Sequence, residues 1–164
     1  MREDIKVYNE ANGWAVWSRG LGGRTRQEAM KTLDVVAAEG SFIGIELAQD
    51  GGFVARLVLG DLTLQEEQSW CARVRRRLEL PAGRLVLSGG FDPRGGDPEG
   101  DEFCHIRNVP PGSYRADIYT CSGLPGAEGG SRTELGFIVQ LRPLAEAPPL
   151  GTPSPVRGGL VRGS

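Results

Sequence analysis

The sequence predicts a mainly β fold: an antiparallel β-sandwich or barrel of about eight or nine strands, with one α-helix packed on it. Three observations support this prediction. Apolar and polar residues alternate over several short stretches, as they do in strands that bury one face. Turn-forming residues are frequent, with 25 glycines and 11 prolines in 164 residues, and many of them fall between those stretches. One further stretch has helical spacing.

The helix is expected at about residues 26–38. Thr25 is a suitable N-cap, and Glu28 follows it three residues later, which is the pattern of a capping box. Apolar residues then recur at helical spacing as far as Gly40, a residue type that commonly ends helices. The apolar stripe consists of Ala29, Met30, Leu33, Val36 and Ala37.

The strands are recognised by alternation and by the turn residues between them. Asn12-Gly13 is a strong signal for a two-residue turn between the first two strands. Residues 103–109 and 113–121 are expected to form a hairpin around Pro110-Pro111-Gly112. Residues 61–69 are expected to be a polar connector. The expected strands outside residues 70–88 are 5–8, 14–18, 41–48, 53–59, 103–109, 113–121 and 135–141.

Residues 70–88 give the clearest hairpin pattern. Apolar side chains occupy one parity and arginines the other, and Leu80-Pro81-Ala82-Gly83 has the composition of a tight turn. The register that gathers the apolar residues on one face places Glu79 opposite Arg84 and Leu78 opposite Leu85. A helical alternative exists, because Thr63 and Glu66 make a possible capping box. The strand is preferred, since a helix would leave Trp70 and Leu80 off the apolar stripe.

This hairpin would display Arg73, Arg75, Arg77 and Arg84 around Glu79 on its outward face. Such a face suits an acidic partner or a phosphate-bearing ligand. The more ordinary interpretation is a solvated face whose charges prevent edge pairing.

The acidic loop 89–102 follows directly, with five acids against one arginine. It is expected to fold near the arginines and partly neutralise them, or to pair with a second copy of the chain. The candidate partner-binding residues are Arg73, Arg75, Arg77, Arg84, Asp92, Asp97, Glu99 and Asp101.

Charge and cysteine content narrow the class of protein. The net charge of −2 disfavours nucleic-acid binding by the chain as a whole. Three cysteines are an odd number without a CxxC pair, which argues against a disulfide framework. The amino terminus lacks the apolar segment of a signal peptide, and nothing approaches a membrane span. We therefore expect a soluble bacterial protein of the cytoplasm with free thiols.

No motif predicts a catalytic residue, a metal or a cofactor. An EF-hand loop counted from Asp97 would need glycine and glutamate at its sixth and twelfth positions, which hold Glu102 and Asn108. His105 follows Cys104, and neighbouring residues of a strand point to opposite faces, so the two are not expected to form a nucleophile pair. His105 is expected to be structural.

Two resemblances agree with the predicted fold. Residues 109–119, Val-Pro-Pro-Gly-Ser-Tyr-Arg-Ala-Asp-Ile-Tyr, resemble the strand that begins with Pro-Gly-x-Tyr in transthyretin-like and carboxypeptidase-regulatory-type sandwich domains. The layout is also similar to that of small competence-associated nuclease inhibitors of bacteria, which implies a mostly β cytoplasmic binding protein. Neither resemblance assigns a role to a residue.

Residues 1–142 are expected to form a single domain, and residues 143–164 a disordered tail rich in proline and glycine. The function predicted first is that of a non-enzymatic protein-binding module, either inhibitor-like or immunity-like, or an accessory subunit, that uses the charged hairpin face. An alternative is a binder of a small anionic or carbohydrate ligand, or a weak hydrolase. Its pocket would be lined by Trp14, Trp17, Trp70 and His105. Homo-oligomerisation through opposite charges is a third possibility.

Overall fold

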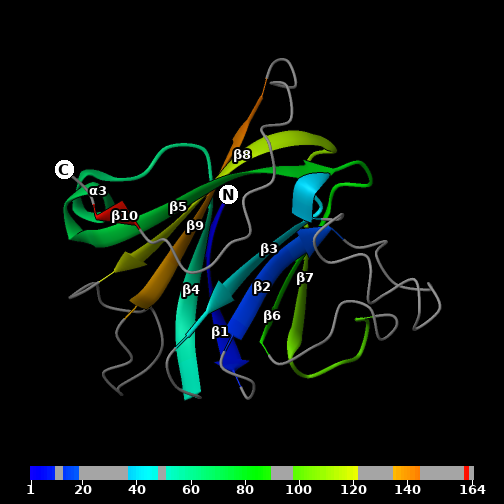
Figure 1. The fold of residues 1–164 in the computed structure, drawn as a ribbon, viewed down its shortest axis with the longest axis horizontal. Helices are drawn as coiled ribbons and strands as arrows, with labels where there is room; N and C mark the ends of the chain where they lie inside the picture. Colours follow the sequence, from blue (N-terminus) through cyan, green and yellow to red (C-terminus); the bar gives the residue numbers. More distant parts are fainter. Residues whose placement is uncertain are drawn as a thin grey trace.

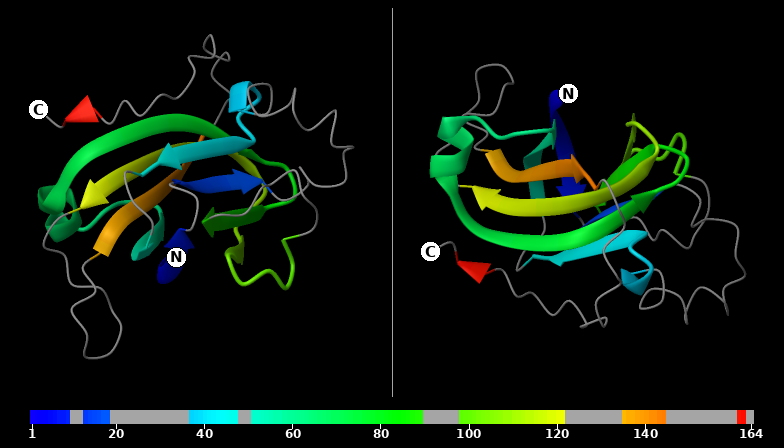
Figure 2. Two further views of the ribbon diagram at one scale, coloured as in Figure 1. Left: turned by 60° about the horizontal axis from the view of Figure 1, so that its bottom comes forward. Right: turned by 90° about the horizontal axis from the view of Figure 1, so that it is seen from above.

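The structure is a computed structural model that describes residues 1–9, 13–18, 37–47, 51–89, 98–121, 135–144 and 161–162. Two β-sheets lie face to face, and a short helix lies at one end of the larger sheet (Figures 1 and 2). The predicted fold class, mainly β with a sandwich-like arrangement of sheets, is confirmed.

The larger sheet has six strands and the smaller has four. Neighbouring strands are antiparallel in both sheets, except that β4 and β9 are parallel. In spatial order, the larger sheet contains β1 (Arg2–Asn9), β4 (Gly51–Leu59), β9 (Leu135–Pro143), β8 (Gly112–Cys121), β5 (Trp70–Leu80) and β10 (Val161–Arg162). The smaller sheet contains β3 (Phe42–Glu46), β2 (Gly13–Ser18), β6 (Arg84–Gly89) and β7 (Cys104–Asn108).

The hydrophobic core lies between the two sheets. The predicted inward parity of β5 is correct for Val74, Leu78 and Leu80, which are buried in this core. It is wrong for Trp70, which packs on the outer face of the larger sheet, because the pairing with β8 shifts register between Trp70 and Ala72. They share it with Leu85 and Leu87 of β6, which are fully buried. Burial of such aliphatic side chains is the main stabilising contribution to this fold, at about 1.5–3 kcal/mol for each one.

The prediction that residues 70–88 form a paired hairpin is wrong. Strands β5 and β6 are joined by a tight turn in which the Gly83 amide donates to the Leu80 carbonyl, 2.9 Å away. However, β5 pairs with β8 in the larger sheet, whereas β6 pairs with β2 and β7 in the smaller one. The turn therefore connects the two sheets, and Leu78 and Leu85 contribute to the core from opposite sides. Two strands joined by a tight turn bury alternate residues whether they pair in one sheet or face each other from two sheets. The alternation therefore does not distinguish a hairpin from a connection between sheets.

The other short connections also change sheet. Strands β7 and β8, on either side of Pro110-Pro111-Gly112, lie in different sheets, so the second predicted hairpin is wrong as well. Strands β1 and β2, and strands β3 and β4, are likewise divided between the sheets. The strands that follow one another and do pair are β2 with β3, β6 with β7, and β8 with β9. These pairs are separated by the longer connections of the chain.

Two glycines allow the sheets to approach each other closely. A Cβ atom at Gly89 would lie 1.9 Å from the carbonyl oxygen of Tyr8, so only glycine fits where β6 ends against β1. Gly83 has a φ of +64°, and a Cβ atom there would lie 2.3 Å from the carbonyl oxygen of Val109. The connections at residues 81–83 and 109–111 therefore pack directly on each other.

The helix within the expected connector was not predicted. Helix α3 (Leu64–Ser69) begins with the capping box of Thr63 and Glu66 and ends where β5 starts at Trp70. The strand prediction for 70–80 is confirmed, and the capping box belongs to the helix before it. Of the helix predicted at 26–38, only residues 37–38 are described, and both are helical, with Gly40 at φ +78° after them.

Within the expected tail, Val161 and Arg162 pair with Arg73 and Ala72 of β5. Residues 145–160, 163 and 164 lie outside the described residues. The division into a domain and a tail stays a prediction.

The candidate functional site on the outer face of the larger sheet

The outer face of the larger sheet is the side of its strands that points away from the core. Its residues form rows that cross from strand to strand, because paired residues lie side by side. Three rows are defined by the strand registers: Arg73–Tyr119–Ile138–Arg56–Asp4, Arg75–Asp117–Gln140–Val58–Arg2, and Arg77–Arg115–Arg142.

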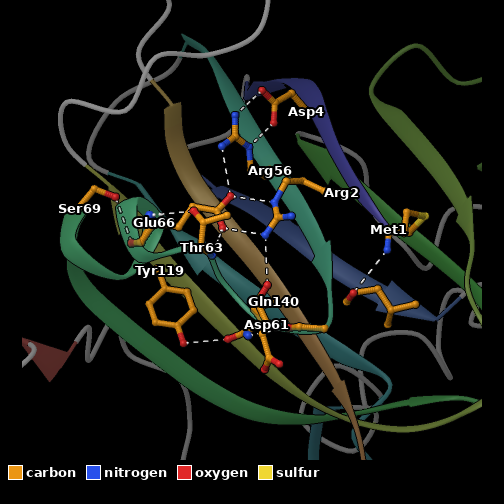
Figure 3. Close-up of polar contacts among 12 residues, drawn as sticks. Met1, Arg2, Asp4, Arg56, Asp61, Thr63, Glu66, Ser69, Tyr119 and Gln140 are labelled. Atoms are coloured by element: carbon orange, nitrogen blue, oxygen red, sulfur yellow. Dashed lines mark hydrogen bonds and ion pairs between the residues drawn. The ribbon is translucent and has the colours of Figure 1, made fainter.

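One end of this face carries a network of ion pairs, which we call the paired cluster: Arg2, Asp4, Arg56 and Glu66. Arg56 donates to both carboxylate oxygens of Asp4, at 2.6 and 2.8 Å, and to Oε1 of Glu66 at 3.2 Å. Arg2 binds both oxygens of Glu66 at 3.0 Å, and the Thr63 amide donates to Glu66 Oε2 at 2.8 Å. Figure 3 shows Arg56 between the two carboxylates. Each guanidinium group of the cluster is therefore matched by a carboxylate.

The Glu66 side chain is only 1% exposed in this cluster. Burial alone would raise its pKa, but hydrogen bonds from Arg2, from the Thr63 amide and from Arg56 lower the pKa below its usual value. The hydrogen bond to Asp4 has the opposite effect on the guanidinium, because it raises the pKa of Arg56. The paired cluster thus anchors α3 to β1 and β4 through a buried carboxylate.

The middle of the outer face is apolar and carries a satisfied polar pair. Val54, Val58, Ile138 and Tyr119 form a buried group, against which Leu62, Trp70 and Cys121 pack. The Tyr119 hydroxyl donates to Oε1 of Gln140 at 3.0 Å, and Nε2 of Gln140 donates to the Gly60 carbonyl at 2.7 Å (Figure 3). Arg73 lies over the Trp70 ring, 5.6 Å from its centroid. The aromatic groups thus connect the paired cluster to the arginines of β5.

The other end of the face is rich in arginine and is organised around one buried carboxylate. Asp117 is fully buried, and its Oδ1 accepts from Arg75 Nε at 2.5 Å. Its Oδ2 lies 3.2 Å from Arg115 Nε. The hydrogen bond to Asp117 raises the pKa of Arg75, whose side chain is still 46% exposed. One buried acid therefore holds two arginines of neighbouring strands at the surface.

Arg77, Arg115 and Arg142 are direct cross-strand neighbours on β5, β8 and β9, and we call them the arginine row. Arg77 is paired with Glu79, whose other oxygen accepts from the Ser113 hydroxyl at 2.6 Å. Arg142 lies 3.2 Å from Asp61, whose side chain is 90% exposed. Among the described residues, this half of the face therefore has five guanidinium groups (Arg73, Arg75, Arg77, Arg115 and Arg142) and three carboxylates that contact them (Asp61, Glu79 and Asp117).

The structure groups only some of the candidate residues predicted from the sequence. Arg73, Arg75 and Arg77 share the outer face, as the alternation predicted. Arg84 does not join them, because it lies in the smaller sheet opposite Asn108. The reason is the change of sheet between β5 and β6.

Of the four acidic candidates, the structure describes only Glu99 and Asp101. Asp92 and Asp97 lie outside the described residues. Glu99 is exposed, and Asp101 accepts from the Phe103 amide at 2.8 Å. The described carboxylates that do contact the arginine-rich half are Asp61, Glu79 and Asp117. Whether any of the candidate residues binds a partner stays a prediction.

Sequence reasoning missed Arg115, Asp117 and Arg142. The signal was present in the alternation of β8 and β9, where Tyr114, Ala116 and Ile118 point to the core and the residues between them point outward. What the sequence did not provide was the order β5–β8–β9, which sets these outward residues side by side.

The tryptophans proposed for a ligand pocket lie in three separate clusters. Trp14 is in the central core, with ring centroids 5.3 Å from Phe53 and 4.9 Å from Phe137. Trp17 belongs to the outer face of the smaller sheet, where its Nε1 donates to Ser88 at 2.9 Å. Trp70 belongs to the outer face of the larger sheet. They therefore do not line one pocket together.

Cys104 and His105 occupy opposite faces of β7, as predicted. Cys104 packs with the outer cluster of the smaller sheet, whereas His105 pairs with Leu87, a residue of the core. Burial raises the pKa of the Cys104 thiol to about 12, with a further contribution from Asp101. Burial, followed by the charge of Arg107, lowers the pKa of His105. A thiol with such a pKa is a poor nucleophile near neutral pH.

In the described part of the chain, no group of three or more His, Cys, Asp and Glu side chains is placed to hold a metal ion. Among the same residues, no helix has the length and apolar character needed to cross a membrane.

Comparison with known proteins identifies a shared fold and no family. No family model matches the sequence, and no curated protein matches it. The structure is similar to that of ComJ from Bacillus subtilis, an inhibitor of the DNA-degrading activity of NucA. The TM-score is 0.52 at 11% identity, over 87% of this chain and 96% of ComJ. It is also similar to the product of crocagin biosynthetic gene J, with a TM-score of 0.57 at 17% identity, over 87% of this chain and 98% of that protein.

Proposed function

We propose that this chain is a protein-binding module, inhibitor-like or an accessory subunit rather than an enzyme, and that its partner contacts the arginine-rich half of the outer face. The observation that carries the proposal is the excess, among the residues that the structure describes, of five guanidinium groups over three carboxylates beside Trp70 and Tyr119. Arginine, tryptophan and tyrosine are the residues most enriched at the energetic centres of protein interfaces. The partner is expected to be acidic at the contact.

Two further observations support a binding role. ComJ, which has this fold, acts as an inhibitor of a nuclease, and the shared fold covers almost all of it. The thiols of Cys104 and Cys121 have pKa values raised to about 12, mainly by burial, which does not suit a cysteine nucleophile. Three free cysteines also fit the proposed location in a bacterial cytoplasm.

The test is capture of a partner from the source bacterium by the tagged full-length chain, followed by rebinding of that partner after purification. The variant Arg73→Glu/Arg142→Glu reverses two charges on the proposed face without touching buried Asp117. The matched control, Arg76→Glu/Arg84→Glu, makes the same charge change at two exposed arginines, and Arg84 lies in the smaller sheet.

We expect the wild type and the control to bind the purified partner, and the Arg73→Glu/Arg142→Glu variant to lose binding while its circular dichroism stays unchanged. Equal binding by all three proteins would show that the partner does not contact the arginine-rich half of the outer face. Loss of binding only in the control would assign the contact to another surface.

A further inference from the structure

We infer that the arginine row is a carboxylate-binding site, which takes an acidic segment of the partner protein. This inference rests on the proposed function and gives the partner's chemistry. The first observation is the arrangement of Arg77, Arg115 and Arg142 on three adjacent strands. Side chains that pair directly across strands have Cβ atoms about 4.5–5.5 Å apart, and like charges in that arrangement repel each other. An anion bound over the row would relieve this repulsion.

The second observation is a pair of buried donors that lack acceptors. Nε of Arg115 and Nε of Arg142 are both buried, and neither makes a hydrogen bond within the described part of the chain. The Arg115 Nε lies 3.2 Å from Asp117 Oδ2 but is not aligned to donate to it. A buried donor without an acceptor costs about 1–3 kcal/mol. Both orphaned donors lie in the row, on adjacent strands.

The third observation is that the row is held in place before any ligand binds. Asp117 contacts both Arg75 and Arg115 from below the surface, and Glu79 is shared between Arg77 and Ser113. The Arg115 and Arg142 side chains are 33% and 38% exposed, so parts of them remain open to solvent. A preorganised guanidinium loses less entropy on binding, and its planar set of donors matches the two oxygens of a carboxylate.

Guanidinium groups also bind phosphate, so the choice of carboxylate needs its own argument. The two ends of the row already contact acids, since Arg77 is paired with Glu79 and Arg142 with Asp61. A continuous phosphate backbone that crossed the row would be brought close to both of these carboxylates. A short acidic segment places one or two carboxylates at the centre of the row, near Arg115, with neutral atoms on either side.

The test uses a peptide with one pair of glutamates between neutral residues, Gly-Ser-Glu-Glu-Ser-Gly with blocked ends, and follows the arginine Nε–Hε signals in NMR spectra of the intact chain. We expect Arg115 and Arg142 to shift downfield on titration, whereas the exposed Arg76 and Arg84 stay in place as internal controls. Arg115→Gln and Arg142→Gln should each weaken binding by about tenfold, the effect of losing one good charge-assisted hydrogen bond. Arg84→Gln should leave the affinity unchanged.

Several outcomes would overturn the inference. Signals of Arg115 and Arg142 that stay still while peptide binds would place the site elsewhere. Tighter binding of inorganic phosphate or of a dT12 oligonucleotide would make the row a phosphate site. Shifts that grow with protein concentration in the absence of peptide would assign the row to a second copy of the chain.

Failure of this inference is distinguishable from failure of the proposed function. If the purified partner binds Arg115→Gln normally but does not bind Arg73→Glu/Arg142→Glu, the proposed contact face is correct. The arginine row is then not the site that binds the partner's carboxylates. If the partner binds all variants normally, both are wrong.

Discussion

The two halves of the outer face use the same residue type in opposite ways. In the paired cluster, two arginines meet two carboxylates, and one of those carboxylates, Glu66, is 1% exposed. Among the described residues of the arginine-rich half, four of five arginines contact three carboxylates. Asp117 is as buried as Glu66 but is divided between two arginines, and Asp61 is 90% exposed. The number of carboxylates for each arginine, and the burial of those carboxylates, therefore decide whether an arginine stabilises the fold or remains available to a ligand.

The physical basis of this difference is the desolvation of charge. A buried carboxylate that loses its cation is left in a medium that does not solvate it, so each partner becomes indispensable. An exposed ion pair is solvated whether or not it forms, and its contribution is about 0–1 kcal/mol. An Arg→Gln substitution should therefore cost much more at Arg56, whose two carboxylates are buried or nearly so, than at Arg142, whose carboxylate is exposed.

The largest effect is expected for Arg56→Gln. This change removes the group that joins Asp4 to Glu66, and it should lower the free energy of unfolding by about 3 kcal/mol, as breaking a buried ion pair does. The measurement is urea-induced unfolding at pH 7, with Arg76→Gln as the control at an exposed position. Equal midpoints for the two variants would mean that the paired cluster does not anchor α3.

The next prediction concerns pH. Because the pKa of Glu66 is lower in the folded state than its ordinary value of 4.5, its ion pairs stabilise the protein above that pH. The stability is lost as the pH falls from about 4.5 through the lower folded-state pKa. Glu66→Gln should therefore be less stable than the wild type at pH 7, and the difference should shrink as the pH is lowered.

Unfolding by urea at a series of pH values between 7 and 3 measures this difference. Asp117→Asn is a useful second variant, because it removes a buried acid from the other half. A gap between Glu66→Gln and the wild type that stays constant with pH would contradict the role given to Glu66.

The contrast between the halves was only partly accessible from the sequence. Alternation along β5 correctly placed Val74 and Leu78 inside and Arg73, Arg75 and Arg77 outside, because one strand's parity is a local property. The sequence also contained the capping box of Thr63 and Glu66. It was interpreted as the start of a helix that would replace the strand at residues 70–80, whereas the observed helix ends before that strand begins.

The arginine row could not be predicted, for a topological reason. A tight turn with apolar residues on one parity fits either a hairpin or a connection between two sheets, and here β5 and β6 follow the second course. Arg77 therefore lies beside Arg115 of β8, about 40 residues further along the chain, whereas Arg84 lies in the smaller sheet. No local pattern records a contact of that kind.

A smaller effect is expected at Cys121, which packs beside the middle of the outer face. Burial, and then the nearby Cys71, raises the pKa of its thiol to about 12, whereas Cys71 is exposed. A thiol reagent at pH 8 should label Cys71 rapidly and Cys121 slowly, with Cys104 of the smaller sheet as a second slow reference.

Glu66→Gln should speed the labelling of Cys121, because loosening α3 exposes this region, and every 1.4 kcal/mol of lost local stability raises the rate about tenfold. Mass spectrometry resolves the three sites. If Cys104 accelerates as much as Cys121, the substitution has loosened the whole protein, and the local role of the paired cluster is wrong.

The smallest effect on stability is expected for Arg142→Gln, and it gives the sharpest comparison of the two halves. Arg142 pairs with a carboxylate that is almost fully exposed, and it lies beside the like charge of Arg115. Losing the pair and losing the repulsion should largely cancel, so the free energy of unfolding should change by less than about 0.5 kcal/mol. The same variant should still weaken binding of the Gly-Ser-Glu-Glu-Ser-Gly peptide about tenfold, because a ligand that satisfies the orphaned Nε depends on that guanidinium. Arg142→Lys keeps the charge and loses the planar donors, so it separates hydrogen bonding from charge attraction. Its affinity should stay low if paired hydrogen bonds hold the carboxylate, and should return to nearly the wild-type value if attraction between charges is enough.

The stability of Arg142→Gln decides whether the two halves differ. A loss as large as that of Arg56→Gln would show that the arginine row stabilises the fold in the same way as the paired cluster, and the distinction between the two halves would be wrong.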